Sequence, residues 1–117
     1  MSTHESVLFV GPLEIRPHER QAIVAGHTLT LSLRELELLE ALARREGRIV
    51  PRSELYETVW GGPLRADDRS VDVYIHKLRV KLADALPGWQ YIHTHFGFGY
   101  RLQAERSHPF HKVATGP

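Results

Sequence analysis

Residues 67–82 constrain the fold of this chain most, and they read DDRSVDVYIHKLRVKL. Wound as an α-helix at ~100° per residue, the segment brings four apolar side chains to one side and predicts a stripe that packs on a core. These four are Val71, Ile75, Leu78 and Leu82. Asp67 and Asp68 stand at the expected helix start, where they suit the helix dipole and can cap the first turn.

The opposite side of this helix carries an apolar residue, Val73, among polar and basic ones: Ser70, Lys77, Arg69 and His76. A solvated helix face usually holds long polar residues, so Val73 needs a partner. Such a face suits a DNA major groove, because Ser bonds either base type, Val touches a thymine methyl and Lys reaches guanine acceptors. A surface helix with one solitary valine explains this segment equally well, so the rest of the chain has to decide.

Composition limits the kind of protein. A chain of 117 residues makes one domain with a small core, and a net charge of +1 means that any nucleic-acid footprint is a local patch. The absence of cysteine rules out disulfides and thiolate metal sites and fits a cytoplasmic protein. We expect no signal peptide and no membrane contact, because no basic N-terminal segment leads into an apolar run and no stretch approaches ~20 apolar residues.

The remaining patterns predict a sheet, three helices and a hairpin. β-prone runs at 7–10, 13–16, 20–24 and 28–31 are separated by turn residues, which predicts a small antiparallel sheet. Ser32 and Glu35 form a capping box that opens a helix to about Arg45, ended by Gly47. A short helix follows from Pro51 through Val59, and two β-prone runs, 89–95 and 99–102, end the pattern.

The fold class expected is therefore α+β: a winged helix-turn-helix with an N-terminal antiparallel β-sheet, three helices and a C-terminal β-hairpin wing. We expect a disordered N-terminus over residues 1–6, the domain over 7–103 and a flexible tail over 104–117.

Residues 7–103 resemble the OmpR/PhoB-type winged-helix DNA-binding domain, the effector domain of bacterial response regulators in two-component systems. The resemblance rests on ordered segments across almost the whole domain, and a single one of them would be a weak signal. These segments are LRELELL at 33–39, RSEL at 52–55, VWG at 59–61, DRSVDVYI at 68–75, KLR at 77–79 and GFGYRL at 97–102.

The resemblance implies transcription regulation by sequence-specific binding to double-stranded DNA, with a recognition helix over residues 69–83 in the major groove. It places a wing, residues 91–102, on the adjacent backbone or minor groove. The positions that match base contacts are Ser70, Val73, Tyr74 and Lys77. Those that match contacts to the DNA backbone are Arg52, Trp60, Arg69, His76, Arg79, Thr94 and Tyr100.

Two further partners follow from the resemblance. The loop 61–67, with Gly61, Gly62, Arg65 and Asp67, matches a segment that touches RNA polymerase in some activators. Such domains also commonly bind direct repeats in tandem, so a second copy on DNA is expected. No receiver domain precedes residue 7 here; if 117 residues were the entire natural protein, phosphorylation in cis would not be its switch.

The wing tip, Phe96, Gly97 and Phe98, departs from the family pattern, which usually places an arginine there that enters the minor groove. Phenylalanine gains nothing from the negative potential of a narrow groove. Either the tip lies on sugars through apolar contact or it contributes little, and a wedge between base steps is disfavoured by the cost of unstacking. Phe98 is expected to pack on the sheet.

His76 is the second departure, because the family usually has a basic phosphate contact at this position. Imidazole gains its charge below neutral pH, so we predict tighter DNA binding at pH 6 than at pH 8.

Simpler roles exist for several of these residues. We favour a core role for Trp60, which is compatible with one edge of its ring facing DNA. Arg69 and Arg79 have a simpler role in ion pairs, with Asp68 and Asp72 as the candidate partners. The chain has eight histidines, and two pairs of them, His93/His95 and His108/His111, are candidates for a metal site. Both are weak candidates because no Cys or cluster of carboxylates accompanies them, so we expect neither a metal nor a cofactor.

An enzyme is disfavoured because no nucleophile set or phosphate-binding loop is present. The rival hypothesis is a winged-helix module for protein–protein interaction with little DNA affinity, which a shallow salt dependence of binding would reveal.

Overall fold

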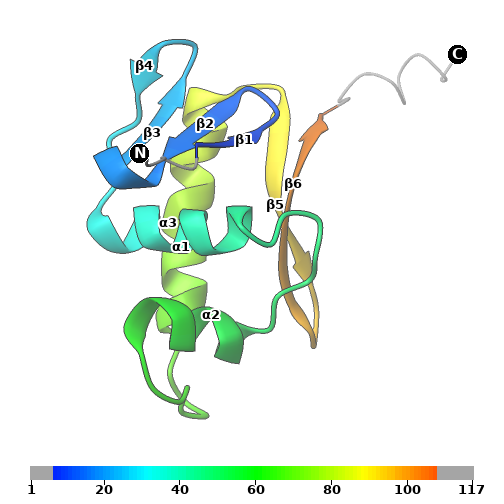
Figure 1. Ribbon diagram of the computed structural model, residues 1–117. Coiled ribbons are helices and arrows are strands. Elements are labelled where there is room, and N and C mark those ends of the chain that lie inside the picture. The colour runs from blue at the N-terminus through cyan, green and yellow to red at the C-terminus, as the bar shows by residue number, and fades with distance from the viewer. Residues whose placement is uncertain (1–6, 108–117) are drawn as a thin grey trace, which may run out of the picture.

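The computed structural model describes residues 7–107 (Figure 1). Four short strands come first, followed by three helices and a hairpin. In chain order the elements are β1 (Leu8–Val10), β2 (Leu13–Arg16), the 3-10 helix η1 (Pro17–Glu19), β3 (Gln21–Val24), β4 (His27–Thr28), α1 (Leu33–Ala43), α2 (Arg52–Trp60), α3 (Ser70–Ala85), β5 (Trp89–His95) and β6 (Gly99–Arg106). This is the winged helix-turn-helix architecture expected from the sequence.

The N-terminal sheet is antiparallel in the order β1-β2-β3-β4. Its inner face buries Val10, Leu13, Ile15 and Ala22 against the helices. The expected fourth strand over 28–31 was wrong, since β4 contains only His27 and Thr28. Leu29 still donates its amide to the Ala22 carbonyl of β3 at 2.8 Å, and the partly buried Leu29 and Leu31 pack against the core.

The capping box of α1 is present. The Ser32 hydroxyl accepts from the Glu35 amide at 3.2 Å, and Glu35 Oε1 accepts from the Ser32 amide at 2.8 Å. The helix ends at Ala43, two residues before the expected end, and turns lead to Gly47. The Gly47 amide donates to the Leu102 carbonyl at 2.9 Å, which ties this connection to β6.

α3 is the central helix of the molecule, and Figure 1 shows α1 crossing it while β5 runs along it. Its four predicted core residues, Val71, Ile75, Leu78 and Leu82, are all buried. Asp68 Oδ1 accepts from the Ser70 amide at 2.8 Å, so it satisfies a free amide of the first turn, while the N-cap residue itself is Arg69. None of the helices within residues 7–107 is long and apolar enough to cross a membrane.

The hairpin of β5 and β6 forms the wing. β6 continues to Arg106, so residues 104–106 belong to this strand and not to the tail expected from residue 104. They stay in the strand because Trp89 and Gln90 of β5 pair with Arg106 and Glu105. The expected disorder of residues 1–6 and the remainder of the expected tail, 108–117, lie outside the described residues.

Candidate nucleic-acid interface

The solvent-facing side of α3 carries the residues that the sequence placed there. Val73 is 46% exposed, while Arg69, His76 and Lys77 are exposed around it. These four residues and Asp72 line a shallow hollow on the helix surface. The helix therefore presents an apolar centre with Arg69, Lys77, His76 and one carboxylate, Asp72, around it, while its opposite stripe is buried in the core.

Tyr74 and Lys77 act as a pair with Trp60 behind them. Lys77 Nζ lies 4.8 Å from the centre of the Tyr74 ring, and that ring meets the Trp60 ring edge-on at 5.7 Å. Tyr56 stacks on the other side of Trp60, with the ring centres 5.2 Å apart. Trp60 is half-buried, so it packs against Tyr74 of α3 and still has some exposed surface.

Arg34 of α1 secures this aromatic cluster. Its guanidinium lies 5.4 Å from the centre of the Trp60 ring and donates to the Val59 carbonyl at 2.8 Å. The bond satisfies a carbonyl in the last turn of α2, which has no partner within the helix. Sequence reasoning assigned Arg34 no role beyond its place in a family motif.

Asp72 joins α2, α3 and the wing, and sequence reasoning gave it no such role. Arg52 Nε of α2 lies 3.0 Å from Asp72 Oδ1, and the Tyr100 hydroxyl of β6 donates to the same oxygen. Burial, together with the bond to Asp72, raises the pKa of Tyr100 to about 12, so this phenol remains a donor at neutral pH. Arg69 approaches Asp72 only to 3.8 Å and is largely exposed.

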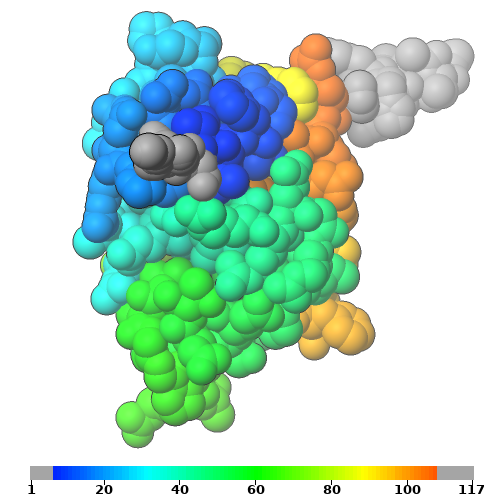
Figure 2. All heavy atoms as spheres, viewed as in Figure 1, coloured from blue at the N-terminus to red at the C-terminus, as the bar shows by residue number. Residues whose placement is uncertain are grey.

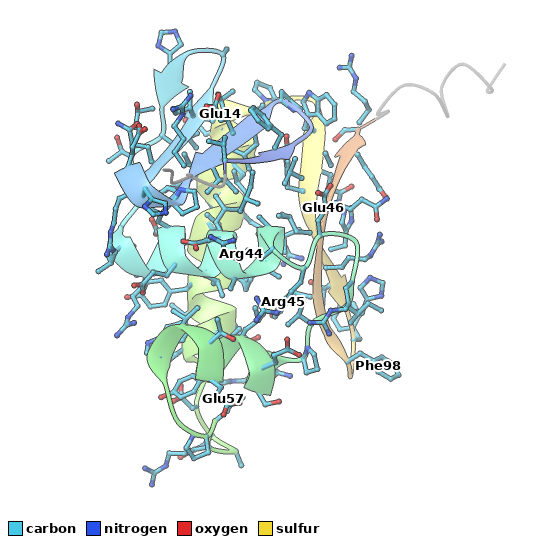
Figure 3. The ribbon with its side chains drawn as sticks, in the orientation of Figure 1. Glu14, Arg44, Arg45, Glu46, Glu57 and Phe98 are labelled. Carbon is cyan, nitrogen blue, oxygen red and sulfur yellow. The ribbon has the colours of Figure 1, made fainter. Side chains whose placement is uncertain are left out.

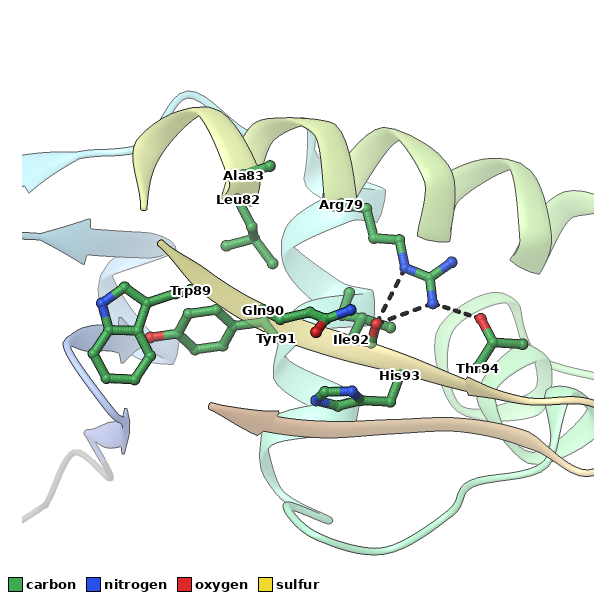
Figure 4. Close-up of a pocket in the computed structure, with 9 residues that line it drawn as sticks. All are labelled: Arg79, Leu82, Ala83, Trp89, Gln90, Tyr91, Ile92, His93 and Thr94. Carbon is green, nitrogen blue, oxygen red and sulfur yellow. Dashed lines mark hydrogen bonds between the residues drawn. The ribbon is translucent and has the colours of Figure 1, made fainter. Parts of the chain in front are cut away.

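Arg79 bonds to the wing, and no ion pair joins it to Asp72 within the described residues. Its Nε and one terminal nitrogen donate to the Ile92 carbonyl at 3.2 and 3.0 Å, and the same terminal nitrogen donates to the Thr94 hydroxyl (Figure 4). The guanidinium lies at one end of a hollow between α3 and β5. Arg79 thus fixes the wing strand β5 against α3.

The loop between α2 and α3 presents all four residues that were matched to a polymerase-contact segment: Gly61, Gly62, Arg65 and Asp67 are exposed. Both glycines have positive φ, 80° and 87°, so the chain turns away from α2 immediately after Trp60.

The wing tip projects beyond the body of the molecule (Figure 2). Phe96 is 88% exposed and Phe98 is 72% exposed, so the expectation that Phe98 packs on the sheet was wrong. The Phe98 amide donates to the His95 carbonyl at 2.8 Å and closes a tight turn at the end of the hairpin. Phe98 lies at this turn, on the outer side of the molecule, and points away from the body (Figure 3).

The histidine pair of the wing is engaged in protein contacts. His93 Nε2 lies 2.9 Å from the Gln103 carbonyl oxygen, and His95 Nε2 accepts from Arg101 Nε at 3.0 Å. Residues 7–107 contain no group of three or more His, Cys, Asp or Glu side chains placed to hold a metal ion. The second pair, His108/His111, lies outside the described residues.

Comparison with known proteins places this arrangement in a family. Residues 26–102 match the family described as "Transcriptional regulatory protein, C terminal". The transcriptional regulatory protein PrrA of Mycobacterium tuberculosis is 38% identical over 104 residues, covering 89% of this chain and 44% of that protein. The chain spans about half or less of the length of the curated relatives it matches.

Solved structures agree with the sequence relatives. The DNA-binding domain of CpxR from E. coli superposes with a TM-score of 0.77 at 35% identity, over 84% of this chain and 96% of that one. The DNA-binding domain of RstA from Klebsiella pneumoniae, solved in complex with the RstA box, superposes with a TM-score of 0.75 at 34% identity, over 84% of this chain and 97% of that one. The chain therefore belongs to the family of C-terminal domains of transcriptional regulatory proteins and has the winged-helix fold of OmpR/PhoB-type DNA-binding domains.

Proposed function

We propose that this chain binds double-stranded DNA sequence-specifically to regulate transcription. The recognition helix lies in the major groove, and the wing lies on the adjacent backbone or minor groove. One observation carries the proposal: α3 leaves an exposed face with Val73 at its centre and Lys77, His76 and Arg69 around it, while its other face is buried. An uncovered helix face of this chemistry fits a major groove, which admits an α-helix.

Base choice is assigned to Ser70, Val73, Tyr74 and Lys77. The shallow hollow around Val73 suits a thymine methyl group, and Lys77 suits the guanine acceptors next to it. The contact of Lys77 with the Tyr74 ring limits the orientations of its ammonium group, which lowers the entropy lost on binding.

Phosphate binding is assigned to the side chains around this face: Arg52, Trp60, Arg69, His76, Arg79, Thr94 and Tyr100. They come from α2, from α3 and its N-cap residue Arg69, and from both wing strands, so they suit phosphates on either side of the groove. Arg79 and Tyr100 also hold the wing and α3 together, and Arg52 joins α2 to α3, so their contribution includes positioning the others.

Two protein partners on DNA are also proposed: a second copy of the chain and RNA polymerase. Binding in tandem to direct repeats is proposed from the family resemblance, and so is contact between RNA polymerase and the loop 61–67. The exposure of Gly61, Gly62, Arg65 and Asp67 leaves that loop accessible to a protein.

The test is selection of bound duplexes from a random pool at about physiological ionic strength, where non-specific binding to phosphates is weak. Enrichment of two similar half-sites in direct repeat supports tandem, sequence-specific binding. Binding to the enriched duplex should then weaken steeply with salt, at about −0.9 per phosphate contact in log–log terms. Failure to enrich any motif would favour the second candidate, a protein-interaction module, for which the uncharged and exposed wing tip is the supporting observation.

A further inference from the structure

The wing tip carries the two most exposed large apolar side chains of residues 7–107, Phe96 at 88% and Phe98 at 72%. They flank Gly97 in the tight turn that joins β5 to β6. Figure 3 shows Phe98 directed away from the body, with no element packed over it. Two neighbouring aromatic rings without cover on a small domain indicate a surface that contacts another molecule.

The tip is held on a rigid support. The Val50 amide donates to the Tyr100 carbonyl at 2.8 Å, and the Tyr100 amide donates to the Val50 carbonyl at 3.0 Å. On the other strand, Arg79 bonds to the Ile92 carbonyl at 3.0 Å. Because both strands are fixed to the body close to the turn, little backbone freedom is lost when the tip binds.

The support also places the tip beside the proposed DNA-binding face. Figure 1 shows the turn of the hairpin at the same end of the molecule as the first turn of α3. The bond from Tyr100 to Asp72 joins the two elements at this end. A duplex that receives α3 in its major groove therefore has its flanking backbone or minor groove within reach of the tip.

The tip offers no charge to that groove. Arg101, the arginine of the wing that lies nearest to the turn in the sequence, donates to His95 Nε2 at 3.0 Å and to Gln103. Arg106 lies over the Trp89 ring, at the opposite end of the hairpin. The contact that Phe96 and Phe98 offer to DNA is therefore the burial of apolar surface.

We propose that Phe96 and Phe98 contact the deoxyribose walls of a minor groove and so select a groove that is wide or easily widened. This inference rests on the proposed DNA-binding function. A cation at this position would gain from the strong negative potential of a narrow A-tract groove, whereas a phenyl ring gains only from burial and needs room. Pyrimidine–purine steps deform readily, so the wing reads the flexibility of base pairs whose edges it does not touch.

The experiment starts from a duplex that the wild-type chain enriches from a random pool. Two versions are made that differ only in the base pairs beside each half-site, one an A-tract and the other alternating T-A steps. We expect wild type to bind the T-A version about ten-fold more tightly, which corresponds to burial of part of two rings. Phe96→Ala and Phe98→Ala should each lose most of this preference, and their salt slopes should equal that of wild type because no phosphate contact is removed.

Phe96→Arg is the opposing variant. It should reverse the preference toward the A-tract and steepen the salt slope by up to about 0.9, since it adds one cation near the phosphates. Phe9→Ala is the matched control, because Phe9 is 64% exposed but lies on β1 of the N-terminal sheet, and it should bind both duplexes as wild type does. Equal unfolding midpoints of all the variants would establish that the fold is intact.

Two results would overturn the inference while leaving the proposed function in place. In the first, Phe96→Ala and Phe98→Ala bind both duplexes with the same affinities as wild type. In the second, wild type binds the A-tract duplex more tightly than the T-A duplex. If wild type enriches no duplex at all, the proposed function and this inference both fail. A change in self-association alone, measured by sedimentation, would assign the tip to a second copy of the chain and also overturn the inference.

Discussion

The hydroxyl of Tyr100 in the wing donates a hydrogen bond to Oδ1 of Asp72 in α3, with 2.5 Å between the two oxygens. The same carboxylate pairs with Arg52 of α2. One acid on an otherwise basic helix face thus joins the three elements from which the proposed contacts to DNA come. The orientation of the wing relative to α3 depends on this bond together with the bonds from Arg79.

Tyr100→Phe should lower both stability and DNA affinity. The change removes the donor from a partly buried carboxylate, and a hydrogen bond to a charged group contributes about 1.5–3 kcal/mol. Tyr91→Phe is the control, because the Tyr91 hydroxyl is also buried but donates to the Val10 carbonyl, away from α3. Urea unfolding should show a lower free energy of unfolding for both variants, and a DNA-binding assay should show a lower affinity for Tyr100→Phe alone. Equal affinities would mean that the wing does not need this bond.

Lys77→Ala and Arg69→Ala should weaken DNA binding in different ways. Lys77 is assigned to a base, so its removal should cost about 1–3 kcal/mol on the selected site and relax specificity. Arg69 is largely exposed and assigned to phosphate, so its removal should weaken all sequences alike and reduce the salt slope by about 1. The measurement is affinity for the selected site and for single-base variants over a salt series. Uniform losses in both variants would show that Lys77 does not read a base.

Glu35 should contribute to the acid sensitivity of folding. Burial by itself raises the pKa of Glu35, but the bonds from Lys81 and from Ser32 outweigh it, and the net pKa lies below the ordinary value. A carboxyl whose pKa is lowered by folding stabilises the protein above the unfolded pKa of about 4.3, and this contribution is lost as pH falls through the folded value. The free energy of unfolding should therefore fall less steeply below about pH 4.3 in Glu35→Gln than in wild type.

The control for this measurement is Glu57→Gln, which changes an exposed carboxylate on α2. It should follow the wild-type curve. A Glu35→Gln curve parallel to that of wild type would assign the acid sensitivity to other carboxylates.

Gly99→Ala should disrupt the base of the wing. A Cβ at Gly99 would lie 2.0 Å from the Val50 carbonyl oxygen, and the backbone there has φ +150°. The strand would have to move away from Val50, which we expect to cost about 3 kcal/mol or more. Gly97→Ala is the matched control. Gly97 also has positive φ, but a Cβ there would meet open space, so we expect the free energy of unfolding to fall by only about 1 kcal/mol. Thermal unfolding of both variants gives the comparison, and equal shifts would exclude the steric explanation.

Local patterns in the sequence were sufficient for much of the fold. The stripe of Val71, Ile75, Leu78 and Leu82 predicted both the helix and its buried side, because helical periodicity depends only on neighbours within the same segment. The capping box of Ser32 and Glu35 was predictable for the same reason. The position of Val73 outside the stripe also predicted its exposure.

Contacts between distant segments were decided by the tertiary structure. Tyr100 and Asp72 are 28 residues apart, and Arg79 and the Ile92 carbonyl are 13 apart, so neither bond follows from spacing along the chain. The exposure of Phe98 depends on where packing places the turn of the hairpin, although its apolar character favoured burial. Periodicity and capping act within a segment, and they determined the elements and their buried sides; the partners of the polar side chains depended on how those elements pack.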